Sequence, residues 1–81
     1  MKQRVNGAFQ ILFEGMDLTV TPISIEEKHA YYRVGFPNQD YIFEQVISYY
    51  NTTAWFPVTA GRAPLAFAIG ELIDYKINSG K

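Results

Sequence analysis

The stretch FQILFEGMDLTVTPISIEEKHAYYRVGF, residues 9–36, decides the fold because apolar side chains recur in it at every second position. Phe9, Ile11 and Phe13 lie on one side of an extended chain, and residues 14–17 then form a typical turn sequence. A period of two is the pattern of a half-buried β-strand. The stretch therefore predicts consecutive antiparallel strands joined by short turns.

The pairing of the first two strands follows from the apolar residues that face one another. A hairpin folded about residues 15–16 sets Phe13 against Leu18. The same register sets Ile11 against Val20, so that one face of the pair stays apolar.

A third strand, residues 29–36, follows a turn predicted at residues 26–28. Pairing Val34 with Val20 extends the apolar face onto this strand. Pro22 has no N–H group to donate to a strand ladder, so it marks an edge or an irregularity in the second strand. We therefore expect three strands that share one inner face.

Residues 41–50 fit two kinds of element. They are rich in β-branched and aromatic side chains, which favours a strand. Their apolar residues also recur at helical spacing, and Asp40 could cap the first turn of a helix. The strand is the favoured prediction and the helix stays open. Residues 54–56 predict a short last strand that Pro57 ends.

Residues 64–78 predict an amphipathic helix. Pro64 suits the first helical turn, where its missing N–H group costs nothing. One arc of the helix collects Leu65, Ile69, Leu72, Ile73 and Ile77. Phe67 falls on the opposite, polar side. Gly70 costs up to about 1 kcal/mol relative to alanine in mid-helix, and a close approach to an aromatic side chain on the sheet would explain it.

Together these elements predict an α+β fold, an antiparallel β-meander of four to five strands with one C-terminal amphipathic helix packed on one face. We expect a single domain over residues 8–78, since 81 residues are few for more than one. A flexible leader at residues 1–7 and a frayed tail at residues 79–81 are expected to flank it.

The composition narrows the classes of function. The chain has no cysteine, which excludes disulfides and thiolate metal sites. Its net charge is -1 and its pI about 5.7, unlike the basic surface of a polyanion-binding domain. No apolar run approaches the roughly 18 residues of a membrane span, and the first residues hold no apolar signal sequence. We expect a soluble cytoplasmic protein with no membrane partner.

The titratable residues do not form a catalytic pattern. His29 is the only histidine and stands at a predicted turn, where we expect a solvated side chain. A metal site needs three or four ligands and a catalytic histidine needs a second group in reach. The eight acidic residues are scattered along the chain. We therefore predict no catalytic residue, no metal, no cofactor and no enzymatic activity.

Arg62 is a candidate anion contact. It lies in the loop before the predicted helix, where free N–H groups favour negative charge. The loop lacks the spacing of a P-loop or a dinucleotide-binding loop. An ordinary connecting loop is therefore the alternative.

The second face of the sheet is the main functional candidate, because one helix covers only one face. Leu12, Ile23, Ile25, Tyr31 and Arg33 are predicted on this outer face, joined by Ile42 and Val46 if residues 41–46 form a strand. Either residues 49–56 cover this face, or it meets another molecule, since exposed apolar patches mark interaction sites.

A non-enzymatic interaction or structural module is the expected function, with a homodimer as the first choice because two-fold dimers are the commonest oligomers. Association is expected through the sheet face or through the helix. Large aromatic side chains dominate binding energies at interfaces. The candidate interface residues are Leu12, Ile23, Tyr31, Arg33, Trp55 and Phe67.

The alternative is a small-ligand or single-stranded nucleic-acid binding module. Bases stack on aromatic rings and on arginine, and the candidates are Tyr31, Arg33, Tyr41, Tyr49, Tyr50 and Trp55. That mode also needs a cationic groove, and the chain is slightly acidic. Nucleic acid is therefore the less expected partner.

Overall fold

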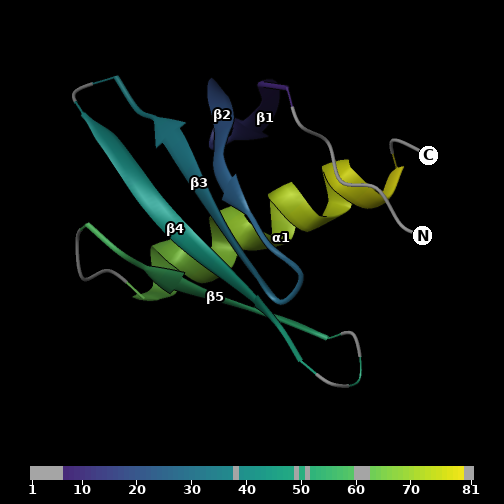
Figure 1. Cartoon of the computed structure of the whole chain (residues 1–81). Helices are drawn as coiled ribbons and strands as arrows, with labels where there is room; N and C mark the ends of the chain where they lie inside the picture. Colours follow the sequence, from purple (N-terminus) through teal and green to yellow (C-terminus); the bar gives the residue numbers. More distant parts are fainter. Residues whose placement is uncertain (1–6, 38, 49, 51, 60–62, 80–81) are drawn as a thin grey trace.

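A computed structural model describes residues 7–37, 39–48, 50, 52–59 and 63–79. In these ranges the chain forms five strands and one helix, which confirms the predicted α+β meander (Figure 1). The elements are β1 (Phe9–Phe13), β2 (Met16–Ile25), β3 (His29–Gly35), β4 (Asp40–Ile47), β5 (Thr53–Pro57) and α1 (Ala63–Ser79). Residues 1–6 and 80–81 of the expected leader and tail lie outside the described residues.

The β1–β2 hairpin turns on two residues, with φ of 51° at Glu14 and 79° at Gly15. Positive φ at both positions defines the tight turn whose twist matches that of the flanking strands. Phe13 therefore pairs with Met16, and Ile11 with Leu18. The predicted register was wrong by two residues, because we expected a wider turn. A shift of two leaves every side chain on its predicted face.

The β2–β3 pairing follows the predicted register as far as Pro22. Val20 pairs with Val34, and the register then shifts between Pro22 and Ser24. This β-bulge confirms the irregularity expected at Pro22. Because a bulge adds one residue to the alternation, Ile25 turns to the inner face and packs against the core. Its predicted place on the outer face was wrong.

Residues 40–47 form strand β4, so the helical alternative is wrong. Phe43 and Gln45 both point inward, opposite Pro57 and Trp55 of β5. Of residues 49–56, the alternative cover for the outer face, Thr53 to Phe56 are instead part of the sheet, since Thr53–Pro57 pairs with β4 as its fifth strand.

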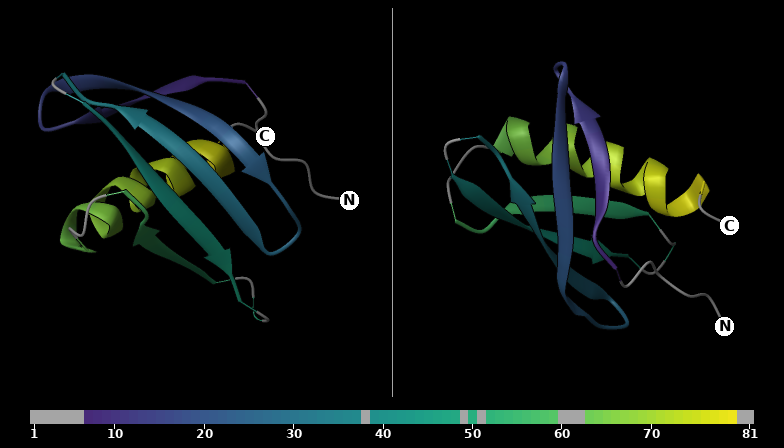
Figure 2. Two further views of the ribbon diagram at one scale, coloured as in Figure 1. Left: turned by 60° about the vertical axis from the view of Figure 1, so that its left-hand side comes forward. Right: turned by 90° about the horizontal axis from the view of Figure 1, so that it is seen from above.

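Helix α1 lies across the inner face and contacts β5, β1 and β4 (Figures 1 and 2). Figure 2 shows the strands twisting strongly from β1 to β5 around the helix. The buried core contains Ile11, Leu18, Val20, Ala30, Tyr32, Val34, Phe43, Trp55, Ala66, Ile69 and Ile73. Ile69 and Ile73 confirm the predicted arc, while Leu65, Leu72 and Ile77 lie at its partly buried margins.

Trp55 and Gly70 set how closely α1 approaches the sheet. A Cβ atom built at Gly70 would lie 2.0 Å from Cγ of Trp55. The glycine thus lets the helix backbone rest on the indole ring, which confirms the reason expected for a glycine in mid-helix. The ring also packs against Tyr32, at 5.5 Å between ring centroids.

Candidate functional site: the outer face of the sheet

The outer face of the sheet is the surface opposite α1, and both views in Figure 2 show the helix on one side only. Within the described residues no second helix or strand layer covers it. Alternation along the strands turns Tyr31 and Arg33 of β3 outward, because Ala30, Tyr32 and Val34 are buried.

Strands β4 and β5 add apolar side chains to this face. Ile42 and Val46 alternate with the buried Phe43 and Gln45, so they point outward as expected for a strand. Phe56 follows the inward Trp55, points outward and is 49% exposed. We had not predicted Phe56 on this face, although its position next to an inward tryptophan carried the signal.

The other predicted residues of this face lie on β1, β2 and β3. Leu12 of β1 and Ile23 at the bulge of β2 are exposed large apolar side chains. Tyr31 is partly buried and Arg33 is exposed. The structure therefore brings together four of the six candidate interface residues on the outer side of the sheet.

A polar cluster stands beside this apolar surface. Nδ1 of His29 and Oε2 of Glu44 lie 3.0 Å apart, a contact that becomes an ion pair when the imidazole is protonated. The Tyr31 hydroxyl donates a 3.4 Å hydrogen bond to the same oxygen. The negative charge of Glu44 raises the pKa of Tyr31, with smaller contributions from desolvation, this hydrogen bond and Glu26. His29 opens β3 and joins this cluster, which the sequence did not predict.

The titration of Tyr31 tests this cluster. We expect Tyr31 to ionise above the ordinary tyrosine pKa of about 10. Because the folded pKa is raised, the contribution of Tyr31 to stability is complete below that value and declines as the pH rises through the folded pKa. Glu44→Gln should lower the Tyr31 pKa towards its ordinary value, as measured by the NMR shift of the phenol carbon. Glu27→Gln is the control, and an unchanged Tyr31 titration in Glu44→Gln would contradict the assignment.

Trp55 lies in the core, with 8% of its surface exposed, and does not belong to the outer face. Its expected place as a surface anchor was wrong because its indole packs under Gly70 of α1. Its Nε1 donates a 2.9 Å hydrogen bond to Oδ2 of Asp74. Oδ2 also accepts from Oγ1 of Thr53 at 2.6 Å, and Oδ1 from Nε2 of Gln45 at 2.9 Å.

This Asp74 cluster was not predicted. Asp74 lies close to Phe67 on the helical projection, on the side that the sequence predicts to be polar. The carboxylate instead joins α1 to β4 and β5 through three donors. Gln45 is buried, and its Oε1 atom has no hydrogen-bond partner within the described part of the chain. The cluster is best explained as a set of hydrogen bonds that holds α1 against β4 and β5.

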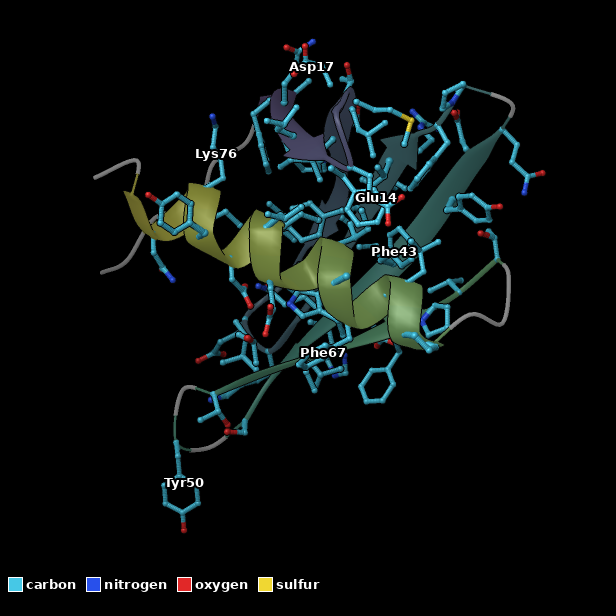
Figure 3. The ribbon with its side chains drawn as sticks, turned by 180° about the vertical axis from the view of Figure 1, so that it is seen from behind. Glu14, Asp17, Phe43, Tyr50, Phe67 and Lys76 are labelled. Atoms are coloured by element: carbon cyan, nitrogen blue, oxygen red, sulfur yellow. The ribbon has the colours of Figure 1, made fainter. Side chains whose placement is uncertain are left out.

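The helix carries the second candidate surface. Phe67 is 62% exposed. The alternative interpretation from the sequence, in which Phe67 packs onto residues 55–57 before the helix, would leave less of it in contact with water. Tyr75, two turns further along α1, is also exposed and was not predicted. Figure 3 shows Phe67 beside the helix, and Tyr50 standing away from the body of the molecule.

The aromatic residues expected to stack on bases are dispersed. Tyr41 packs against the core and contacts Phe36 edge-on, at 5.1 Å between centroids. Trp55 is buried, and Tyr50 stands in a turn far from the sheet face (Figure 3). Tyr49 and the anion candidate Arg62 lie outside the described residues.

The described residues contain neither a metal site nor a membrane-spanning helix. The described residues hold no group of three or more histidine, cysteine or acidic side chains placed to hold a metal ion. No helix in the described ranges has the length and apolarity needed to cross a bilayer. Comparisons with protein-family models, curated proteins and solved structures find no significant match.

Proposed function

We propose that the protein is a small non-enzymatic interaction module that associates with another protein chain through the outer face of its sheet. The observation that carries the proposal is a sheet face that no described helix or strand covers, with apolar side chains on neighbouring strands. Ile42 and Val46 lie on β4, and Phe56 on β5 is nearly half exposed. An antiparallel sheet that is covered on one face only normally presents polar residues to water on its other face.

The composition of the face supports a protein partner. Interface centres combine apolar and aromatic side chains with arginine and are depleted of most other charges. The middle of this face places Tyr31 and Ile42 beside Arg33, with the carboxylates of Glu44 and Asp40 on either side of Ile42 along β4. One cation among apolar side chains does not make the continuous cationic track that a nucleic-acid backbone needs.

Sedimentation velocity over a concentration series tests the proposal. We expect the wild-type chain to associate as its concentration rises, and Ile42→Asp to remain monomeric because the new carboxylate would be buried in the interface. Phe67→Ala is the matched control on the helix and should associate like the wild type. Circular dichroism checks that both variants fold.

Two outcomes would contradict the proposal. A wild-type chain that stays strictly monomeric at high micromolar concentration would exclude self-association in this form. An association that Phe67→Ala abolishes and Ile42→Asp preserves would move the interface from the sheet to the helix.

A further inference from the structure

We propose that the partner is a second copy of this chain, packed face to face about a two-fold axis that lies along the diagonal from Tyr31 to Ile42. This inference rests on the proposed function and adds the identity and orientation of the partner. Four residues at the centre of the outer face support it: Tyr31, Arg33, Ile42 and Glu44. We name them the central quartet.

The central quartet forms a rectangle across two strands. Tyr31 of β3 pairs with Glu44 of β4, and Arg33 pairs with Ile42. Neighbouring strands lie about 4.8 Å apart and same-face residues about 6.6 Å apart along a strand. The two charged residues therefore occupy opposite corners about 8 Å apart, and the two apolar or aromatic residues occupy the other corners.

This arrangement is complementary to itself. In a face-to-face dimer the two-fold axis lies in the plane of the interface and exchanges positions on either side of it. An axis along the Tyr31–Ile42 diagonal sets Arg33 of each copy against Glu44 of the other. Tyr31 and Ile42 then lie on the axis, and each meets its own counterpart.

The charges also select this axis over the other diagonal. An axis along the Arg33–Glu44 diagonal would place arginine on arginine and glutamate on glutamate, and such like-charge contacts are strongly unfavourable in an interface. The favoured diagonal makes an angle of about 36° with the strands, from the spacings of the rectangle. The strands of the two sheets would then cross at about 70°, nearer to the orthogonal class of sheet packing than to the aligned class.

Both charged groups are available for the contact. Arg33 is exposed, and the single ion pair found among the described residues is that of His29 with Glu44. The contacts of Glu44 with His29 and Tyr31 both end on Oε2. Oε1 is therefore the oxygen that we assign to Arg33 of the second copy.

A standard interface takes roughly 800 Å² of accessible surface from each partner. The central quartet alone is far smaller, so the contact has to include the apolar residues around it, such as Val46, Phe56 and Ile23.

A charge-exchange experiment tests the arrangement. In Arg33→Glu the dimer would set two carboxylates against each other, and in Glu44→Arg two arginines. We expect each variant alone to raise the dimer dissociation constant about tenfold or more. The double variant Arg33→Glu/Glu44→Arg restores opposite charges at both contacts and should return to within about threefold of the wild type. An equimolar mixture of the two single variants should form heterodimers.

Lys76→Glu is the control for Arg33→Glu, since it makes the same change in net charge on α1 and should leave association unchanged. The outcomes separate this inference from the proposed function. If the wild type is monomeric, both fail. If Ile42→Asp abolishes dimers but the single charge variants do not weaken them, or the double variant does not recover, the face is right and the two-fold arrangement is wrong.

Discussion

Replacing Gly70 by alanine is expected to destabilise the fold by about 3 kcal/mol or more, although alanine is the better helix former by about 1 kcal/mol. The added Cβ would lie 2.0 Å from Cγ and 2.2 Å from Cδ1 of Trp55. Real contacts of this kind are never so short, so either the helix or the indole ring has to move.

The indole ring has little freedom to move. Its Nε1 group donates a 2.9 Å hydrogen bond to Asp74, and the ring packs against Tyr32. Chemical denaturation followed by circular dichroism measures the loss, with Glu71→Ala as the control. Glu71 is exposed on the same helix, so its replacement should change stability by a few tenths of a kcal/mol at most. A Gly70→Ala variant as stable as the wild type would contradict the close helix–tryptophan contact.

The second large effect is expected for Asp74→Ala, a loss of about 3–4 kcal/mol. The carboxylate accepts hydrogen bonds from Gln45, Thr53 and Trp55. A hydrogen bond to a charged group contributes about 1.5–3 kcal/mol, and a buried donor left without its acceptor adds a desolvation cost. The three contacts act as a unit, so their contributions will not add in full.

The same denaturation experiment tests Asp74, with the fluorescence of Trp55, the single tryptophan, as a second probe. Asp74→Asn keeps the size of the side chain but turns one acceptor into a donor that faces another donor. We therefore expect it to lose more than half of the unfolding free energy that Asp74→Ala loses. A loss below about 1 kcal/mol for Asp74→Ala would show that the cluster does not fasten the helix.

Much of the fold could be predicted because local periodicity carries it. The alternation in residues 9–36 placed three strands, and the helical spacing of Ile69 and Ile73 placed the helix face. The hairpin register was missed because it depends on the conformation of Glu14 and Gly15. A glutamate with positive φ is not evident from a pattern of apolar residues.

The rest depends on contacts between distant parts of the chain. Trp55 could not be assigned to the core from a short strand, since its burial is fixed by Gly70. Asp74 likewise accepts hydrogen bonds from residues of β4 and β5, and these strands lie beside the helix only in the folded chain. The bulge after Pro22 was foreseen as an irregularity, but its effect on Ile25 follows only from the position of the extra residue.

The candidate surface was also predicted in part from local alternation and in part not at all. Tyr31 and Arg33 were placed on the outer face by alternation alone, and Ile42 was placed there on the condition that residues 41–46 form a strand. The pairing of Tyr31 with Glu44 and of Arg33 with Ile42 required the register of β3 and β4. The charge pattern from which we infer a second copy therefore emerged only in the folded sheet.

The most direct test of the outer face as the site of association is an isotope-filtered NOE measurement on an equimolar mixture of labelled and unlabelled full-length chain. We predict intermolecular NOEs that connect the methyl groups of Ile42 with those of Ile42, and the ring of Tyr31 with that of Tyr31, in the other copy. Intermolecular NOEs confined to Phe67 and Tyr75 of the helix, or none under conditions where sedimentation shows the dimer, would contradict it.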